Sequence, residues 1–279
     1  MRVGLIQLSV GDDPAVNLPV TQGLIAQAAV EGAELVLTPE ATNCLSSDRA
    51  HQAAILRHED DDPTLAALCR QAAELGIWLL VGSLALKAQD TAQGDAPFVN
   101  RSFLIGPDGA INARYDKIHM FDVQISETET YRESSAYRPG NRAVMANTPF
   151  GGIGMTICYD VRFPHLYRRL AQAGARILTV PAAFNDTTGA AHWEILLRAR
   201  AIECGAFVLA PAQCGLHADR TGRNRRSHGH SMAVGPWGEV LLDAGTDIGV
   251  SVIDLDLQAV DRARARVPAL FHDRDFEGP

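Results

Sequence analysis

The chain has 279 residues, of which 47% are hydrophobic and 21% are charged, and it carries a net charge of −8 at pH 7. This composition supports a large core and excludes a disordered chain, while the negative charge argues against a general nucleic-acid-binding protein. No apolar run approaches the ~20 residues that cross a membrane, so we expect neither nucleic acid nor membrane as a partner.

The five cysteines show no C-x-x-C spacing, and no charged and apolar signal segment precedes the apolar stretch at residues 3–8. An odd number of unpatterned cysteines predicts neither a disulfide framework nor a zinc site. A reducing compartment fits this pattern best. We therefore expect a cytoplasmic protein without a bound metal.

One sequence pattern, or phrase, recurs four times along the chain: a predicted helix ends at a glycine, and an apolar run follows directly. The four glycines are Gly32, Gly76, Gly174 and Gly205. A glycine just past a helix adopts the left-handed conformation that closes it, so each phrase predicts a helix-to-strand joint. The apolar runs lack polar alternation, which predicts strands that are buried on both faces.

These phrases fall into two halves with the same plan: strand, helix, strand, helix, strand and then a hairpin. The halves begin at strands expected near residues 3–8 and 153–157, and both hairpins turn at Gly-Pro-x-Gly, at residues 106–109 and 235–238. Two half-sheets, each covered by helices on one face, bury their bare faces against each other. We predict an α/β fold, a four-layer α-β-β-α sandwich with pseudo-twofold internal symmetry. It would form a single domain over residues 1–279, with a C-terminal arm from about residue 254.

Three reactive side chains are expected at the ends of three different strands. Glu40 follows the strand at residues 35–39, Lys117 follows the return strand of the first hairpin, and Cys158 ends the first strand of the second half. Because these strands end at one edge of the sandwich, a carboxylate, an ammonium and a thiol should lie together. Glu40 would take the thiol proton, Lys117 would stabilise an oxyanion, and Cys158 would form a thioester.

Cys158 stands on a predicted elbow. The apolar run that ends at Ile157 breaks off at the cysteine, and Pro164 then opens an amphipathic helix. Taken singly, each of the three residues is also compatible with a structural role, as a small buried hydrophobe for the cysteine and as loop charges for the other two. The sequence contains no G-x-S-x-G, H-E-x-x-H, Walker or G-x-G-x-x-G motif that would indicate another mechanism.

Three blocks around these residues resemble the nitrilase, or carbon–nitrogen hydrolase, superfamily: Thr38-Pro39-Glu40, Asp116-Lys117-Ile118-His119 and Ile157-Cys158-Tyr159-Asp160. The resemblance covers essentially the whole chain and implies a Glu-Lys-Cys catalytic triad on the same sandwich. It also implies a second functional glutamate at Glu133, and an oxyanion donor in the backbone N–H of Tyr159.

The segment at residues 158–164 resembles the ω-amidase and deaminated-glutathione-amidase branch of this superfamily. The resemblance implies that Arg162, Phe184 and Thr188 bind the substrate, with Arg162 gripping a carboxylate next to a 2-oxo group. The structural alternative for Arg162 is a salt bridge to Asp160 or to another neighbouring residue that braces the elbow.

The expected activity is hydrolysis of the side-chain carboxamide of a 2-oxo-acid-type substrate, with deaminated glutathione favoured, to a carboxylate and ammonia through a cysteine thioester. The alternatives are an ω-amidase acting on 2-oxoglutaramate, another aliphatic amide or nitrile hydrolase of the superfamily, and a non-catalytic scaffold on this fold. No metal or organic cofactor is expected, and the resemblance implies a homodimer or a higher homo-oligomer. The basic loop at residues 220–226 is either solvated or binds the distal carboxylate of the longer substrate.

Overall fold

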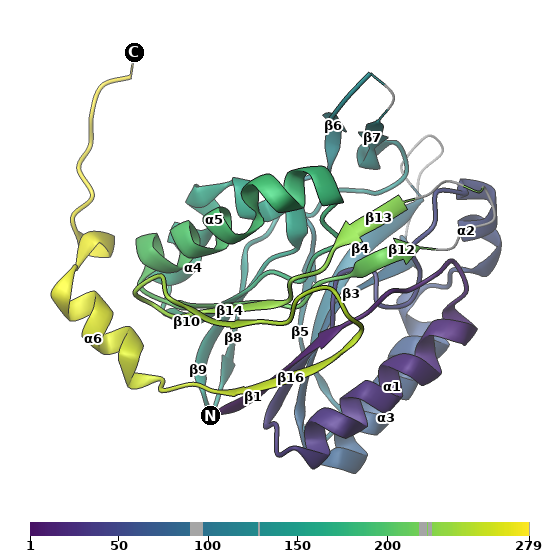
Figure 1. Cartoon of the computed structure of the whole chain (residues 1–279), viewed down its shortest axis with the longest axis horizontal. Helices are drawn as coiled ribbons and strands as arrows, with labels where there is room; N and C mark the ends of the chain where they lie inside the picture. The colour runs from purple at the N-terminus through teal and green to yellow at the C-terminus, as the bar shows by residue number, and fades with distance from the viewer. Residues whose placement is uncertain (90–96, 128, 218–221, 223–224, 279) are drawn as a thin grey trace.

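Two six-stranded sheets pack face to face at the centre of the computed structural model (Figure 1), which describes residues 1–89, 97–127, 129–217, 222 and 225–278. The first sheet has the order β16-β1-β2-β3-β4-β5 and the second β15-β14-β11-β10-β9-β8. The strands of the first are β1 (Arg2–Gln7), β2 (Leu35–Leu37), β3 (Trp78–Lys87), β4 (Phe98–Ile105), β5 (Ile111–Asp116) and β16 (Gly249–Asp254). Those of the second are β8 (Val144–Thr148), β9 (Gly151–Met155), β10 (Ala175–Thr179), β11 (Phe207–Ala210), β14 (Met232–Val234) and β15 (Val240–Asp243).

The two sheets repeat one topology. In the first, β1, β2 and β3 are parallel and β4 and β5 continue antiparallel. In the second, β9, β10 and β11 are parallel and β14 and β15 continue antiparallel. This match confirms the predicted sandwich with its pseudo-twofold symmetry. The edge strands β16 and β8, which were not predicted, each pair antiparallel with the first strand of a half.

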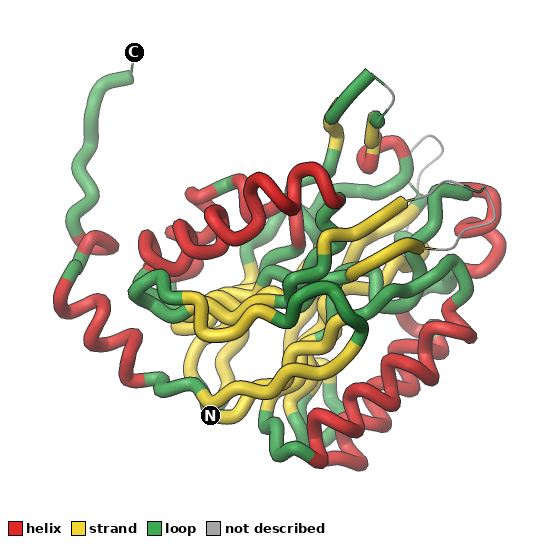
Figure 2. The backbone as a smooth tube through the Cα atoms, viewed as in Figure 1, coloured by secondary structure: helices red, strands yellow, loops and turns green. Residues whose placement is uncertain are grey.

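Four long helices form the outer layers. α1 (Pro14–Val30) and α3 (Pro63–Leu75) cover the first sheet, whereas α4 (Pro164–Gln172) and α5 (Asp186–Cys204) cover the second (Figure 2). The four predicted joint glycines all have positive φ, and two of them, Gly76 at 64° and Gly205 at 51°, are the left-handed C-caps of α3 and α5. The helix-to-strand joints are therefore confirmed.

Smaller elements surround the carboxyl ends of the central strands. They are the helix α2 (Arg49–Ile55), the hairpin β6 (Asp122–Gln124) and β7 (Thr130–Arg132), and the hairpin β12 (Cys214–His217) and β13 (Arg225–His228). Single-turn 3₁₀ helices are η1 (Glu59–Asp61), η2 (Glu133–Ser135), η3 (Cys158–Arg162) and η4 (Ala269–Phe271).

Alternate side chains of the central strands belong to two different cores. In β1, Leu5 packs into the cluster between the sheets, while Ile6 packs into the cluster beneath α1 and α3. In β3, Leu80 and Leu79 divide in the same way. Since each fully buried aliphatic side chain contributes roughly 1.5–3 kcal/mol, both faces of the first sheet stabilise the fold and fix the strand ends that carry the site.

After β16 the chain continues into α6 (Gln258–Arg266), which lies against the second half. Arg176 forms an ion pair with Asp261 at 2.6 Å, and the Arg264 guanidinium donates to the carbonyl of Cys204 at 3.2 Å. Just beyond η4, Asp273 pairs with Arg168 and accepts from the Gln172 side chain at 2.6 Å, and after it the tail runs away from the body of the protein (Figure 1). The division into one domain and a C-terminal arm stays a prediction. Within the described residues, no helix has the length and hydropathy of a membrane span.

Candidate active site

The nucleophile candidate occupies a strained turn between β9 and α4. Cys158 begins η3 with a φ of 47°, in the left-handed region that side chains other than glycine rarely adopt. Its N–H donates to the carbonyl of Pro181 at 2.9 Å, which ties the turn to the strand end after β10. The predicted elbow is present at this position, with Pro164 as the first residue of α4.

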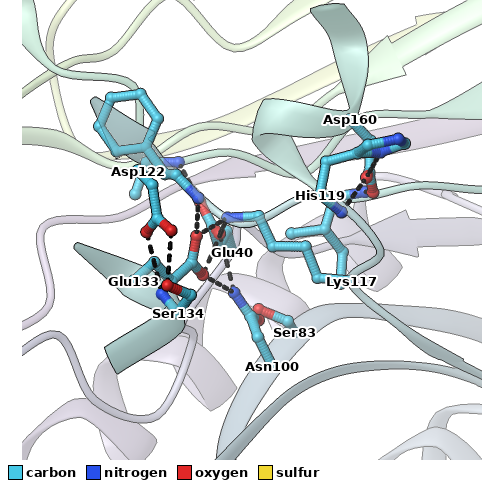
Figure 3. Close-up of polar contacts among 12 residues, drawn as sticks. Glu40, Ser83, Asn100, Lys117, His119, Asp122, Glu133, Ser134 and Asp160 are labelled. Atoms are coloured by element: carbon cyan, nitrogen blue, oxygen red, sulfur yellow. Dashed lines mark hydrogen bonds and ion pairs between the residues drawn. The ribbon is translucent and has the colours of Figure 1, made fainter. Parts of the chain in front are cut away.

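Glu40 and Lys117 meet beneath this turn, although they come from different strands. Glu40 follows β2, Lys117 follows β5, and the Lys117 Nζ lies 2.8 Å from Glu40 Oε1 (Figure 3). Lys117 is only 2% exposed. A buried ammonium needs compensating negative charge, and here two carboxylates supply it.

The second carboxylate belongs to Glu133, the first residue of η2. Its two oxygens lie 3.0 and 2.9 Å from Lys117 Nζ, and one also accepts the Phe121 N–H at 2.6 Å. Beside it, the Ser134 N–H donates to Asp122 of β6 at 3.0 Å, which anchors this turn (Figure 3). The structure thus brings Glu133 to the residues it was predicted to accompany.

Asn100 of β4 is part of the same network and was not singled out from the sequence. Its Nδ2 donates to Glu40 Oε1 at 2.9 Å and to Glu133 Oε1 at 3.4 Å, while its Oδ1 is buried without a partner. The other Glu40 oxygen accepts the Ala183 N–H at 2.9 Å. In the sequence of β4, Asn100 is one of three consecutive polar residues with Arg101 and Ser102, and nothing distinguished it from them.

The three central groups shift one another's pKa. Burial would raise the pKa of Glu40, but the charge of Lys117 and its hydrogen bond outweigh burial and lower it. Burial would lower the pKa of Lys117, but Glu133 and Glu40 raise it well above its usual value. Burial and the neighbouring Glu40 raise the pKa of the Cys158 thiol far above its usual value. At neutral pH the site therefore holds an ionised glutamate, an ammonium and a protonated thiol, with a hydrogen bond between glutamate and thiol.

These groups line a cavity of about 120 Å³. Its wall includes the reactive residues, Tyr159, several aromatic side chains and three arginines from surrounding elements. The lining residues that matter here are Glu40, Asn100, Lys117, Glu133, Cys158, Tyr159, Phe184, Thr188, Arg49, Arg132 and Arg225. A reacting carbonyl in this cavity would contact the thiol, the carboxylate and the ammonium together.

The carbon–nitrogen hydrolase family model matches residues 2–265. The chain belongs to this family. It is therefore a hydrolase of carbon–nitrogen bonds other than peptide bonds, and the superfamily resemblance is confirmed.

Relatives of this carbon–nitrogen hydrolase match nearly its whole length. A deaminated glutathione amidase of Yersinia enterocolitica is 38% identical over 98% of this chain and 93% of its own. The crystal structure of the C. elegans NitFhit protein superposes with a TM-score of 0.87 at 33% identity, covering 98% of this chain and 65% of that longer one. An amidase from Nesterenkonia sp. AN1, solved as a glutamate-to-glutamine variant with acrylamide added to its active-site cysteine, has a TM-score of 0.77 at 28% identity.

The substrate-binding residues predicted for this hydrolase lie in or behind the cavity wall. Phe184 and Thr188 line the cavity, whereas Arg162 is not among the lining residues. The Arg162 guanidinium lies 5.6 Å from the Phe184 ring centre and 5.8 Å from that of Tyr159, and it donates to His192 Nδ1 at 3.2 Å. The alternative salt bridge between Arg162 and Asp160 is not formed, because Asp160 is bonded to other groups.

The basic loop of the hydrolase divides between two environments. Arg225 lines the cavity, donates to the carbonyl of Ala183 at 3.2 Å, and has a buried Nε without a partner. Arg226 points to Asp186, with an ion pair of 3.0 Å. Arg220 and Arg223 lie outside the described residues. No group of three or more potential metal ligands occurs in the part of the chain that the structure describes.

Proposed function

We propose that this carbon–nitrogen hydrolase cleaves the amide bond of a 2-oxo-acid-type substrate through a thioester on Cys158. One observation carries the proposal: Glu40, Lys117 and Glu133 form a buried ion cluster at the base of the cavity that also exposes Cys158. A scaffold protein would have no reason to keep two carboxylates and an ammonium buried at the base of a pocket, since burying charges costs free energy.

In the acylation step, the Cys158 sulfur attacks the amide carbon while Glu40 takes the thiol proton. The developing oxyanion is stabilised by the Lys117 ammonium and by the N–H of Tyr159, which lies in the first turn of η3 where backbone donors lack intrahelical acceptors. Glu133 holds Lys117 in place from the opposite side. The tetrahedral intermediate collapses to the thioester when Glu40 passes its proton to the leaving nitrogen.

In the deacylation step, Glu40 removes a proton from water, and the hydroxide adds to the thioester carbon. Collapse of the second tetrahedral intermediate releases the carboxylate and returns the proton to sulfur. The amine that leaves depends on the substrate. The ammonia expected from the sequence leaves only a primary amide such as 2-oxoglutaramate, whereas deaminated glutathione, whose amide nitrogen carries Cys-Gly, releases that dipeptide. No step requires a metal or an organic cofactor.

Carboxylate recognition is proposed for the arginines around the cavity. Arg162 faces rings on the cavity wall, and its guanidinium donates to a ring nitrogen of His192. Phe184 and Thr188 would contact the acyl chain. Arg225 lies inside the cavity and would bind a second carboxylate, as the distal end of deaminated glutathione offers. Guanidinium groups suit this role because they bind carboxylates through two parallel hydrogen bonds.

Deaminated glutathione is the favoured substrate because relatives that match along the whole chain carry that activity in their names. The ω-amidase reaction on 2-oxoglutaramate is the alternative, and both reactions yield the same acyl product, 2-oxoglutarate. Cytoplasmic location and a homo-oligomeric state, in which the outer helices and the tail would form the contact, also remain proposals.

The decisive experiment compares kcat/KM for the two amides, with 2-oxoglutarate as the common readout and with ammonia and free Cys-Gly measured separately. Cys158→Ala should abolish turnover of both substrates and leave the fold intact. Lys117→Ala should lower kcat by about 10²-fold or more, the usual effect of losing an oxyanion donor. Turnover near wild type in the Cys158 variant would overturn the mechanism, and a Lys117 variant that changes only KM would make Lys117 a binding residue.

A further inference from the structure

A buried carboxylate outside the cavity connects the two halves of the active site. Asp160 is 0% exposed and lies two residues after Cys158 on η3. One of its oxygens, Oδ1, contacts the His119 N–H at 3.0 Å and the His119 ring Nδ1 at 2.7 Å. Because a carboxylate accepts hydrogen bonds, Nδ1 is the protonated ring nitrogen. The His119–Asp160 pair is visible beside Lys117 in Figure 3.

The other oxygen, Oδ2, is also saturated. It accepts the Tyr115 hydroxyl at 2.7 Å and the Ile157 N–H at 2.8 Å. A carboxylate that receives four donors from two chain segments holds those segments in a single relative position. None of these residues is among those that line the cavity, so a direct role in the chemistry does not explain the arrangement.

The residues that donate to Asp160 flank Lys117 in the sequence. Tyr115 precedes Lys117 by two residues and His119 follows it by two, so both flanks of the lysine are bonded to Asp160. Tyr115 belongs to β5 of the first sheet, and Asp160 follows β9 of the second. The hydrogen bonds therefore cross from the sheet that carries the ammonium to the sheet that carries the nucleophile.

The elbow makes a further contact with the same segment. The His119 ring stacks on Phe163, with ring centres 3.5 Å apart and planes inclined by 7°. Phe163 caps the end of η3, directly before α4. Stacking fixes the plane of the imidazole, and the hydrogen bond to Asp160 fixes its rotation within that plane.

We propose that Asp160, with Tyr115 and His119, positions the Lys117 ammonium relative to the Cys158 sulfur. Lysine has a long and flexible stem, so its head group can meet an oxyanion only if the backbone on both sides of it is held. Misplacement of a catalytic group by about 1 Å can cost 10²-fold in rate. The inference rests on the proposed triad, and Cys158→Ala tests that triad separately.

The test uses substitutions that remove single hydrogen bonds in the full-length enzyme. Tyr115→Phe removes the hydroxyl donor and keeps the ring, and His119→Leu removes the ring donor. We expect each to lower kcat by roughly 10-fold or more while KM for the amide changes little, since the substrate contacts remain. His119→Asn offers an N–H close to the position of Nδ1 while losing the same stacking as His119→Leu, so it should recover much of the lost kcat.

A matched control distinguishes the effect of lost positioning on kcat from the effect of losing any buried hydroxyl group. Tyr167→Phe removes a buried phenol that bonds Thr156 at 2.6 Å and makes no hydrogen bond to Asp160. It should retain kcat within about 3-fold. Urea unfolding of every variant establishes that the assays measure folded protein.

A double-mutant cycle with Lys117→Ala tests whether the effect passes through the lysine. If Asp160 acts by positioning Lys117, His119→Leu should cost much less in the Lys117→Ala background than in wild type. An undiminished loss in that background would overturn the inference. Wild-type kcat in both Tyr115→Phe and His119→Leu would overturn it as well, as would a His119→Asn variant no better than His119→Leu.

Discussion

Burial and the neighbouring Glu40 keep the proton on the sulfur of Cys158, whereas the charge of Lys117 outweighs burial and keeps the carboxylate of Glu40 ionised. In the proposed mechanism Glu40 therefore acts as a general base that removes the thiol proton as the sulfur attacks, and no preformed thiolate is required. This assignment has a direct consequence for the dependence of activity on pH.

The pKa of Glu40 is lowered from its usual 4.5, so the base stays ionised as the pH falls to that value. We expect the acid limb of kcat/KM to have its midpoint below pH 4.5, because activity is lost as Glu40 becomes protonated. The measurement is kcat/KM against pH, with circular dichroism at each pH to confirm that the protein is folded. An acid limb centred near pH 6.5 with the fold intact would indicate a histidine base instead.

Asn100 bonds both carboxylates and should hold Glu40 at the correct angle to the thiol. Asn100→Leu should lower kcat by roughly 10- to 100-fold, as misplaced catalytic groups do, with a loss of about 1.5–3 kcal/mol in unfolding free energy for bonds to charged groups. Steady-state kinetics measure kcat, and urea unfolding measures the free energy of unfolding. Asn112→Leu, at an exposed asparagine of β5, is the control and should change neither; wild-type kcat in Asn100→Leu would make the asparagine dispensable.

At the scale of elements, the sequence predicted the parts of the site whose signals are local. Glu40 and Cys158 each follow an apolar strand, and Lys117 follows the return strand of the first hairpin, so their shared edge could be inferred from the repeated plan. Asn100 could not, because it stands in a run of three polar residues in β4, and such a run does not reveal which of them faces the site. The edge strand β16 was missed because its partner β1 lies at the other end of the chain.

The β12–β13 hairpin offers a comparison between neighbouring arginines. Arg225 lines the cavity with an unpaired Nε, whereas Arg226 is exposed and paired with Asp186. Arg225→Gln should raise KM for deaminated glutathione by about 10-fold or more, since a charge-assisted hydrogen bond contributes roughly 1.5–3 kcal/mol. It should affect 2-oxoglutaramate, which has a single carboxylate, much less.

Arg226→Gln is the matched control for this change, because a surface ion pair contributes only about 0–1 kcal/mol. Its kinetics on both amides should resemble those of the wild type. An equal rise in KM for both substrates in Arg225→Gln would mean that Arg225 supports the cavity wall and does not bind the second carboxylate.

At the scale of the whole molecule, the exposed apolar side chains on the outer layer of the second half bear on assembly. Ile195 and Ile202 of α5 are 69% and 57% exposed, and they stand seven residues apart on one face of the helix. Trp237, in the β14–β15 turn beside Ile202, is 50% exposed. An apolar row of this kind on an outer helix supports the predicted homo-oligomer.

Replacing both isoleucines should therefore break the assembly without disturbing the site. In Ile195→Asp/Ile202→Asp, two charges would have to be buried at the contact, a cost that an interface does not tolerate. Sedimentation equilibrium should show the wild type as a dimer or larger and the variant as a monomer. The control is Val16→Asp/Val20→Asp on α1, where the side chains are 65% and 51% exposed on the opposite outer layer; it should keep the wild-type mass. A monomeric wild type, or a double isoleucine variant that keeps the wild-type mass, would exclude the α5 face as the contact between subunits.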